Sequence, residues 1–368
     1  MARAGLGDDW SCLFANDIDA KKGASYAANW GDEHLKVEDV SNIATEQLPG
    51  HADLAWASFP CQDLSLAGDG AGLNGERSGT FWPFWRLMQA LVKENRAPSL
   101  VVLENVCGAL SSHGGKDFAA IGEALAGDYK FGAVVIDAVR FVPQSRPRLF
   151  VVGIRNDLDI PVRLTALAPD ARWHPAHLVN AYHKLSQCSK AKWIWWILPA
   201  PPPRQFVFSD LIEEEPHSVV WHTPEETKRL LSLMSTINRR KVEHAKQVGG
   251  RRVGGVYKRT RMDKNGKRAQ RAEVRFDDIS GCLRTPIGGS SRQTLIIVED
   301  GEVRSRLLSP REAARLMGLP DSYALPHNYN DAYHLAGDGV VVPVVRHLAA
   351  HLLEPLLAPA KRKRKEAA

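Results

Sequence analysis

The chain has 368 residues, of which 44% are hydrophobic, so it can bury a large core, and its length predicts one large domain with a smaller one. Its longest aromatic and apolar run, residues 193–198, is far too short to cross a bilayer, which excludes a membrane partner from our expectations. The formal net charge of +6 favours an anionic partner but does not identify it, because many basic proteins bind no nucleic acid.

The cysteines and histidines indicate neither secretion nor a metal site. The five cysteines form no Cys-x-x-Cys pair, and no charged N-terminal segment precedes an apolar core, so we expect a cytoplasmic protein. One cluster could suggest zinc, namely His174, His177, His183 and Cys188. Its spacing fits no common structural zinc site, so we predict no metal.

The first 158 residues alternate between predicted strands and helices. Residues 1–10 read as the end of a helix, and apolar runs predict strands over 11–15, 53–57, 100–106 and 149–154. Apolar residues at helical spacing predict helices over 81–95 and 117–125. This alternation favours an α/β fold, with a mostly parallel sheet and helices on both faces.

A candidate nucleophile follows the strand at 53–57, within Ser58-Phe59-Pro60-Cys61-Gln62. A thiol attacks only as thiolate, and a loop near a helix N-terminus or a cation is where its pKa can be lowered. Five glycines between residues 68 and 79 indicate a mobile lid beside it. A buried structural cysteine at a turn is the alternative for Cys61.

Two later motifs supply a carboxylate and two guanidinium groups. The strand at 100–106 ends in Glu104-Asn105-Val106, and Gln144-Ser145-Arg146-Pro147-Arg148 leads into the strand at 149–154. Ligands of open α/β sheets bind outside the carboxyl ends of the strands, so we expect Cys61 and Glu104 to face one crevice.

The second half of the chain is less regular and more basic. The proline run at 199–203 predicts a linker, and residues 238–271 contain 13 Lys or Arg against two acidic residues. This run is either a solvated charged face or a nucleic-acid contact. Two motifs follow, at 308–318 and at Gly337-Asp338-Gly339-Val340, before a basic tail at 361–365.

In this order and spacing the motifs resemble those of the cytosine-C5 DNA methyltransferase family, over about residues 10–155 and 290–355. The family's motifs are Pro-Cys-Gln, Glu-Asn-Val, Gln-x-Arg-x-Arg, a helix like Arg-Glu-Ala-Ala-Arg, and Gly-Asn-x-Val. The resemblance implies a Rossmann-like, S-adenosylmethionine-dependent DNA (cytosine-5-)-methyltransferase that flips its target base out of double-stranded DNA. It further implies a monomer, with a cognate restriction endonuclease as a possible partner.

The resemblance also implies a domain plan. A catalytic and cofactor-binding domain is expected over 1–158 and again over 293–357. A smaller, irregular target-recognition domain is expected over 159–292, with its basic segment at 238–271, and a basic tail over 358–368.

Site residues follow by position in the family's motifs. Cys61 would add to the base, Glu104 would act as acid, Asn105 would orient the loop, and Arg146 would hold the base's O2 or Glu104, with Arg148 structural. Cofactor contacts would come from Asp17, Ile18, Asp39, Val40, Pro60, Phe81, Asp338, Gly339 and Val340. DNA contacts would come from Gln62, Ser65, Arg77, Arg251, Arg252, Lys258, Arg259, Arg284, Thr285 and Arg292.

The chain departs from the family at its start. The family begins with a strand and a Phe-x-Gly-x-Gly-Gly turn, whereas this sequence begins with what reads as the following helix. We expect a start codon assigned too late. The alternatives are a transfer-RNA cytosine-C5 methyltransferase, which shares the Pro-Cys motif, and an N-terminally truncated, inactive DNA-binding homologue.

Overall fold

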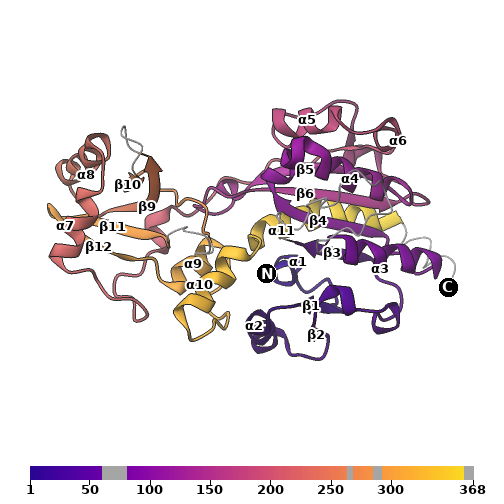
Figure 1. Ribbon diagram of the computed structural model, residues 1–368, viewed down its shortest axis with the longest axis horizontal. Helices are drawn as coiled ribbons and strands as arrows, with labels where there is room; N and C mark the ends of the chain where they lie inside the picture. The colour runs from indigo at the N-terminus through magenta and orange to yellow at the C-terminus, as the bar shows by residue number, and fades with distance from the viewer. Residues whose placement is uncertain (60–80, 263–267, 285–291, 360–368) are drawn as a thin grey trace. The chain divides into compact units, whose positions relative to one another are not determined.

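The computed structural model describes residues 1–59, 81–262, 268–284 and 292–359, apart from the side chain of Arg261. The chain forms two compact units (Figure 1). Unit 1 comprises Met1–Gly5, Ala138–Arg146 and Pro201–Val345. Unit 2 comprises Leu6–Asp137, Pro147–Ala200 and the chain from Arg346 onward.

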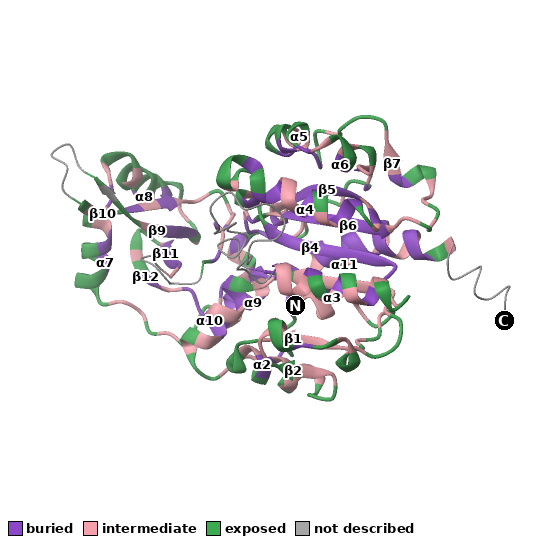
Figure 2. Ribbon diagram, turned by 45° about the vertical axis from the view of Figure 1, so that its right-hand side comes forward, coloured by how far each residue is buried: buried purple, intermediate pink, exposed green. Residues whose placement is uncertain are grey.

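Unit 2 is built on a sheet with the strand order β3-β4-β6-β5. Its strands are β3 (Leu54–Ser58), β4 (Leu100–Val106), β5 (Tyr129–Asp137) and β6 (Pro147–Arg155). Consecutive residues of β4, β5 and β6 are buried, as Figure 2 shows, so both faces of the sheet are covered. The predicted α/β class is confirmed.

Three helices of unit 2 pack into one hydrophobic cluster with the sheet. They are α3 (Phe81–Lys93), α4 (Lys116–Ala126) and α5 (Ala176–His183). Trp85, Phe118 and Leu178, one from each helix, share this cluster with Val101 of β4 and Phe131 of β5. The helices predicted over 81–95 and 117–125 are therefore confirmed, with ends that differ by one or two residues.

One strand of this sheet runs against the others. β3 and β4 are parallel, but β6 runs antiparallel to both β4 and β5. The chain between β5 and β6 has only residues 138–146, with one short helix at Ala138–Arg140. A connection this short joins antiparallel neighbours, whereas a parallel pair needs a longer crossover.

A separate parallel pair lies near the start of unit 2. β1 (Ala15–Asp17) pairs with β2 (Leu35–Val37), and α2 (Ala20–Trp30) connects them. The strand predicted over 11–15 thus begins at the last of those residues. The remaining short elements of this unit are η1 (Val40–Asn42), η2 (Thr45–Gln47), η4 (Cys107–Leu110), η5 (Ser112–Gly115), η7 (Val162–Leu164), β7 (Thr165–Ala166), α6 (Gln187–Ala191), β8 (Trp195–Trp196) and η9 (Ala349–Leu353).

Residues 159–200 were predicted to start the second domain, but they belong to unit 2. The backbone of Phe131 in β5 accepts a hydrogen bond from Ile194 N at 2.7 Å, and the Trp196 indole donates to Val152 O at 3.2 Å. A Cβ on Gly132 would lie 1.9 Å from Ile194 O, so this close approach of the two backbones requires glycine. The segment was missed because its irregular, proline-interrupted pattern resembles a linker.

Unit 1 is regular where an irregular domain was expected. Its antiparallel sheet has the order β10-β9-β11-β12, made of β9 (Arg252–Met262), β10 (Arg268–Arg275), β11 (Thr294–Glu299) and β12 (Glu302–Leu307). α7 (Pro224–Ser232) and α8 (Thr236–Val248) bury Leu230 and Val242 against it. Since β11 pairs directly with β9, the predicted return to the catalytic domain at residue 293 does not occur there.

A buried ion pair joins β12 to the helix that follows it, α9 (Pro310–Leu316). Arg306 donates to Glu312 through two bonds of 2.6 and 2.9 Å, and both side chains are fully buried. Glu312 also accepts from the backbone of Ser309 at 2.7 Å and of Glu213 at 2.8 Å. The pair therefore ties three segments of unit 1 together.

Helices η8 (Phe208–Leu211) and α10 (Tyr329–Asp338) also belong to this unit, whereas α1 (Ala2–Leu6) and α11 (Val342–Leu348) contain residues of both units.

One segment of the described chain, Tyr329–Pro359, is long and apolar enough to resemble a membrane span by length and composition. However, 61% of its most apolar window is buried inside the protein, as expected of a core helix.

We predict that Glu312→Gln lowers the free energy of unfolding of unit 1 by about 3–5 kcal/mol, because it leaves the Arg306 cation buried without its counter-ion. Hydrogen exchange of the β12 and α9 amides measures the loss. Asp277→Asn is the matched control, since the Arg275–Asp277 pair is partly exposed and should contribute less than about 1 kcal/mol. Equal losses in the two variants would contradict the assigned role of the buried pair.

Candidate active site

The candidate site lies at the carboxyl ends of β3 and β4. These strands are parallel, and Ser58 pairs directly with Glu104. Cys61 follows Ser58 by three residues, but Pro60, Cys61 and Gln62, together with the predicted lid at 68–79, lie outside the described residues. The register therefore brings Glu104 beside the strand end that leads into the Pro-Cys motif.

Asn105 fixes the end of β3. Its side-chain amide donates to Phe59 O at 3.0 Å in a buried position, and its side-chain oxygen accepts from Val106 N at 2.8 Å. Phe59 is the last described residue before the Pro-Cys motif. This geometry supports the predicted role of Asn105 in orienting that loop.

Arg148, which we predicted to be structural, is the arginine that contacts Glu104. Its Nε lies 3.2 Å from Glu104 Oε1, and the two side chains are only 14% and 8% exposed. Glu104 pairs with Phe150 across β4 and β6, so Arg148, two residues away, lies on the same face of the sheet. The sequence could not assign this contact, because it depends on the register of antiparallel strands.

The side chain of Arg146 donates hydrogen bonds to backbone carbonyl groups of unit 1. It is 1% exposed and donates to Gly337 O and Gly339 O at 2.7 Å each and to Leu283 O at 2.9 Å. Three carbonyls thus share one guanidinium, which joins segments far apart in the sequence. Within unit 1 this arrangement has a structural effect, and the role predicted for Arg146 toward the base stays a prediction.

Cys107 is a second thiol close to Glu104 in the chain. Burial raises its pKa, although the charge of Arg148 opposes the shift. A raised pKa keeps Cys107 protonated and hence a poor nucleophile. It offers no rival to Cys61 for thiolate chemistry.

Four of the predicted cofactor residues lie at one edge of the β1–β2 pair. Asp17 ends β1 and Asp39 follows β2, and Glu38 N donates to Asp17 O at 3.1 Å. Hydrogen bonds from Ser41 lower the pKa of Asp39, so it is an acceptor at neutral pH. Ile18 is 68% exposed and Val40 is half-buried. Two carboxylate acceptors beside exposed apolar side chains suit a ribose and a purine ring.

The other predicted cofactor residues are placed differently. Phe81 is fully buried and packs on Phe59 with ring centroids 5.5 Å apart, so its ring is part of the core in this structure. In unit 1, Asp338 is exposed, Gly339 half-buried and Val340 buried.

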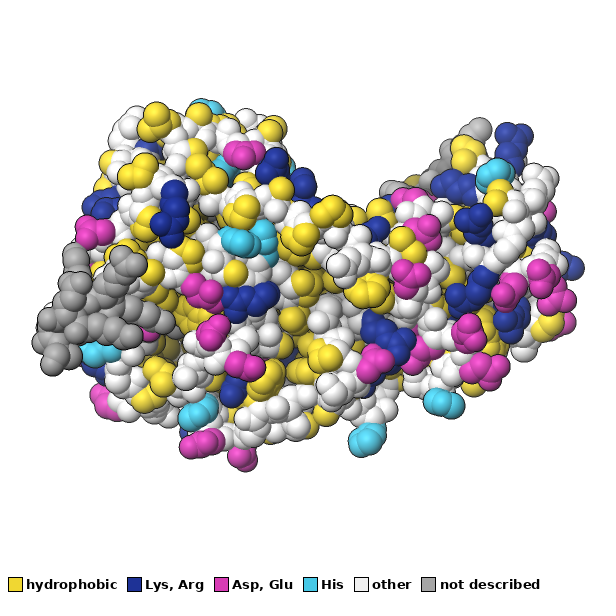
Figure 3. All heavy atoms as spheres, turned by 180° about the vertical axis from the view of Figure 1, so that it is seen from behind, with side chains coloured by type: hydrophobic (Ala, Val, Ile, Leu, Met, Phe, Trp, Pro, Cys, Tyr) yellow, Lys and Arg dark blue, Asp and Glu magenta, His cyan; other side chains and the backbone are white. Residues whose placement is uncertain are grey.

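The predicted DNA contacts that the structure describes all lie in unit 1, where Lys and Arg side chains gather at the end carrying β9, β10 and α8 (Figure 3). Arg252, Arg259 and Arg284 are exposed, whereas Arg251 and Lys258 are half-buried. The half-buried Arg292 lies over the Tyr329 ring and donates to Asn330. Gln62, Ser65, Arg77 and Thr285 lie outside the described residues.

The β9–β10 hairpin extends beyond the core of unit 1. Neighbouring positions such as Arg259 and Thr260 on β9, and Gln270 and Arg271 on β10, are exposed, so both faces of this ribbon meet solvent. Arg259 lies directly opposite Arg271, an unfavourable arrangement that a bound anion would relieve. Glu273 relieves it only partly, at 3.6 Å from Arg259.

Of the four residues considered for zinc, His174 is buried, whereas His177, His183 and Cys188 are exposed. Burial lowers the pKa of His174 to about 4, and its Nδ1 accepts from Asp170 N at 2.9 Å. Within the described part of the chain, no group of three or more His, Cys, Asp or Glu side chains is arranged to hold a metal ion.

Known proteins are similar to this chain over nearly all of its length. The family model for C-5 cytosine-specific DNA methylase matches residues 1–354. The Type II methyltransferase M.NlaX of Neisseria lactamica is 27% identical, covering 97% of this chain and 93% of the relative. The Type II methyltransferase M.HhaI of Haemophilus parahaemolyticus is 25% identical, covering 93% and 87%.

Solved structures agree on the fold. A DNMT2 mutant from Spodoptera frugiperda matches with a TM-score of 0.59 at 17% identity, covering 96% of this chain and 94% of that one. The S. pombe Dnmt2 methyltransferase matches with a TM-score of 0.52 at 16% identity, covering 95% and 91%.

We predict that Asn105→Ala destabilises unit 2 by about 1–3 kcal/mol, because the Phe59 carbonyl would stay buried without its donor. Chemical denaturation followed by circular dichroism measures the effect. Asn156→Ala is the control, since the Asn156 side chain donates to Gly127 O and accepts from Lys192 in partly exposed positions where water can replace both bonds, and it should cost less than about 0.5 kcal/mol. A smaller loss in Asn105→Ala than in the control would remove Asn105 from this role.

Proposed function

This chain belongs to the C-5 cytosine-specific DNA methylase family and is an enzyme of that type, and we propose that it methylates a cytosine flipped out of double-stranded DNA through a covalent adduct with Cys61. The observation that carries the proposal is the parallel register of Ser58 with Glu104. It supports a thiol and a carboxyl group acting on one base from two adjacent strand ends.

The chemistry requires both groups. C5 of cytosine is a poor nucleophile, so the Cys61 thiolate first forms a bond to C6 and moves electron density toward C5 and N3. Glu104 donates a proton to N3 and accepts a hydrogen bond from the exocyclic amine. After methylation, the C5 proton passes to solvent, the thiolate departs to restore the C5–C6 double bond, and the N3 proton returns to Glu104. Because these atoms are stacked inside a duplex, the base must leave the helix first.

Arg148 positions Glu104 for this step. The Arg148 guanidinium, 3.2 Å from Glu104 Oε1, fixes the orientation of the carboxyl group, which has to take up a proton before it can act as the acid. Removal of Arg148 would leave the acid misplaced in the free enzyme.

S-adenosylmethionine is the cofactor that the family implies, and when bound it supplies the methyl group. The donor set fits it: Asp17 can accept from the ribose hydroxyls and Asp39 from the adenine amine, with Ile18 and Val40 against the ring. We propose that these four residues hold its adenosine part.

Duplex DNA is the substrate that the exposed hairpin favours. A two-stranded ribbon fits the major groove, and Arg259 and Arg271 present guanidinium groups that suit phosphates and guanine edges. A transfer-RNA substrate would need no such ribbon, because A-form RNA has a major groove that side chains cannot enter.

We predict that Cys61→Ser abolishes methyl transfer and leaves DNA binding little changed, because the thiol acts after recognition. The measurement is transfer of labelled methyl groups to duplex DNA and to transfer RNA, with covalent trapping on DNA containing 5-fluorocytosine. Trapping by Cys61→Ser would overturn the adduct. Transfer to RNA alone would overturn the substrate, and binding of DNA without transfer by the wild type would favour the inactive homologue.

Arg148→Gln should lower kcat by about 10²-fold through misplacement of the acid Glu104, and Arg148→Lys should recover part of the loss by restoring the charge. Steady-state kinetics at saturating DNA test this. Arg155→Gln is the control on the same strand, because Arg155 forms a partly exposed pair with Asp157. A kcat for Arg148→Gln equal to that of the control would exclude the positioning role.

A further inference from the structure

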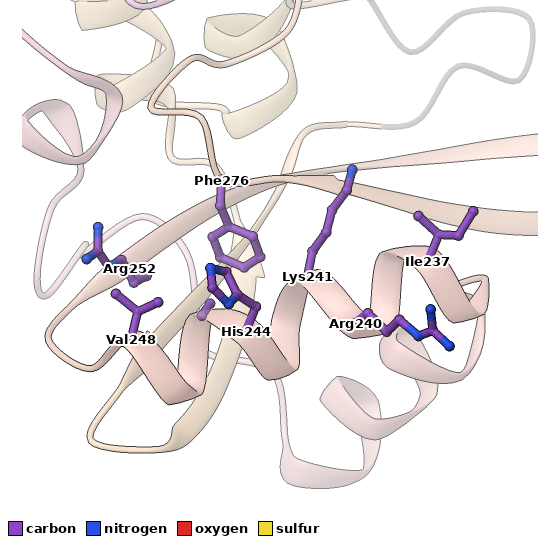
Figure 4. Close-up of a pocket in the computed structure, with 8 residues that line it drawn as sticks. Ile237, Arg240, Lys241, His244, Val248, Arg252 and Phe276 are labelled. Atoms are coloured by element: carbon purple, nitrogen blue, oxygen red, sulfur yellow. The ribbon is translucent and has the colours of Figure 1, made fainter.

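Unit 1 contains a groove that the predicted site residues do not explain. It lies between α8, Arg252 of β9 and Phe276, which follows β10. It has a volume of about 530 Å³ and is open to solvent (Figure 4). Among the predicted DNA contacts, Arg252 alone lines it. The lining residues are Ile237, Arg240, Lys241, His244, Ala245, Val248, Arg252 and Phe276.

The floor of the groove is apolar. The Phe276 ring lies over Gly254, where a Cβ would come within 2.7 Å of the ring, so the glycine allows the ring to lie against β9. Figure 4 shows the rings of Phe276 and His244 next to each other. Ile237 and Val248, at the two ends of α8, are 69% and 49% exposed. Such exposed apolar surface is ready to cover the carbon atoms of a ligand.

The rim of the groove is cationic. Arg240, Lys241 and Arg252 are all exposed, although the Lys241 ammonium also donates to Val274 O at 3.1 Å, and no carboxylate is among the described lining residues. Two carboxylates close by in the sequence have other partners: Glu243 pairs with Lys246 at 2.9 Å, and Asp277 pairs with Arg275. The repulsion among the rim cations therefore favours an anion in the groove.

The groove's length suits a strand of nucleic acid. Its α8 residues run from Ile237 to Val248, which spans about 17 Å at 1.5 Å per residue. One strand of B-DNA rises 3.4 Å per nucleotide, so this length matches about five nucleotides. A single inorganic anion or a nucleotide would use only part of it.

We propose that this groove is a second DNA-contact site, which binds the phosphodiester backbone beside the segment that the β9–β10 hairpin contacts. Phosphates pair with Arg240, Lys241 and Arg252, and deoxyribose carbons lie on Phe276 and the apolar ends of α8. The proposal rests on the proposed function, since it takes duplex DNA as the substrate.

The test compares two double variants of the full chain that lose the same charge. Arg240→Gln with Lys241→Gln removes two of the three rim cations, whereas Arg239→Gln with Lys228→Gln removes exposed cations that do not line the groove. Fluorescence anisotropy measures the affinity for two duplexes of unrelated sequence between about 50 and 200 mM salt. Arg240→Gln alone serves as a milder variant, should the double variant fold poorly.

In the groove variant, the slope of log affinity against log salt should fall by about 1.8, which is two contacts of about 0.9 each, and the affinity for both duplexes should fall by the same factor. The control should change the slope by less than half as much. Equal changes in the two variants, or no change in the groove variant, would overturn the proposal. So would inorganic phosphate that saturates the groove at constant ionic strength without competing with DNA.

A separate measurement keeps this result apart from the proposed function. Methyl transfer to duplex DNA by the wild type tests the enzyme itself. If the wild type methylates DNA while the two double variants behave alike, the groove assignment fails and the function stands. If the wild type neither binds nor methylates duplex DNA, both fail.

Discussion

The parallel register of β3 and β4 is the constraint on which the candidate site depends. Side chains alternate between the faces of a strand, so a slip of one residue would turn Glu104 to the opposite face. The register is held at two places. The buried apolar residues of β4 from Leu100 to Leu103 anchor the strand inside the sheet, and Asn105 binds Phe59 O where β3 ends. Packing and one side-chain amide together hold Phe59, the last described residue before the Pro-Cys motif, beside the end of β4.

The sequence predicts the elements that carry one strong local signal. β4 was predicted residue for residue, and α3 within two residues, because an unbroken β-branched run and a helical apolar period are hard to mistake. The direction of β6 and the partner of Glu104 were not predictable in this way. The first depends on the length of the 138–146 connection, and the second on which residue of β6 lies beside Glu104 once the strands have paired.

The Arg-Glu-Ala-Ala-Arg helix shows how a motif can mark a family while its physical role stays hidden. In the sequence it served only as a marker. In the structure Glu312 accepts from Arg306, from Ser309 and from the backbone of Glu213, and the side chains of Arg306 and Glu312 are fully buried. Burying two charges is expensive, and such a pair is weak evidence of stability by itself. Its effect is to allow one arrangement of β12 and α9, since any other would leave a charge without its partner.

Burial, more than the number of cations, separates the arginines that hold this protein together from those that suit a polyanion. Arg146 and Arg306 are both nearly inaccessible, and each ends on carbonyl or carboxylate oxygens. Arg240 and Arg252 are exposed and share a groove in which no described lining residue is acidic. The net charge of +6 counts buried and exposed arginines alike and therefore says little about binding partners. A buried cation that is already bound to oxygen atoms of the protein cannot approach DNA and release its counter-ions. The exposed cations of the groove and the hairpin can, so they are where the free energy of counter-ion release is available for binding.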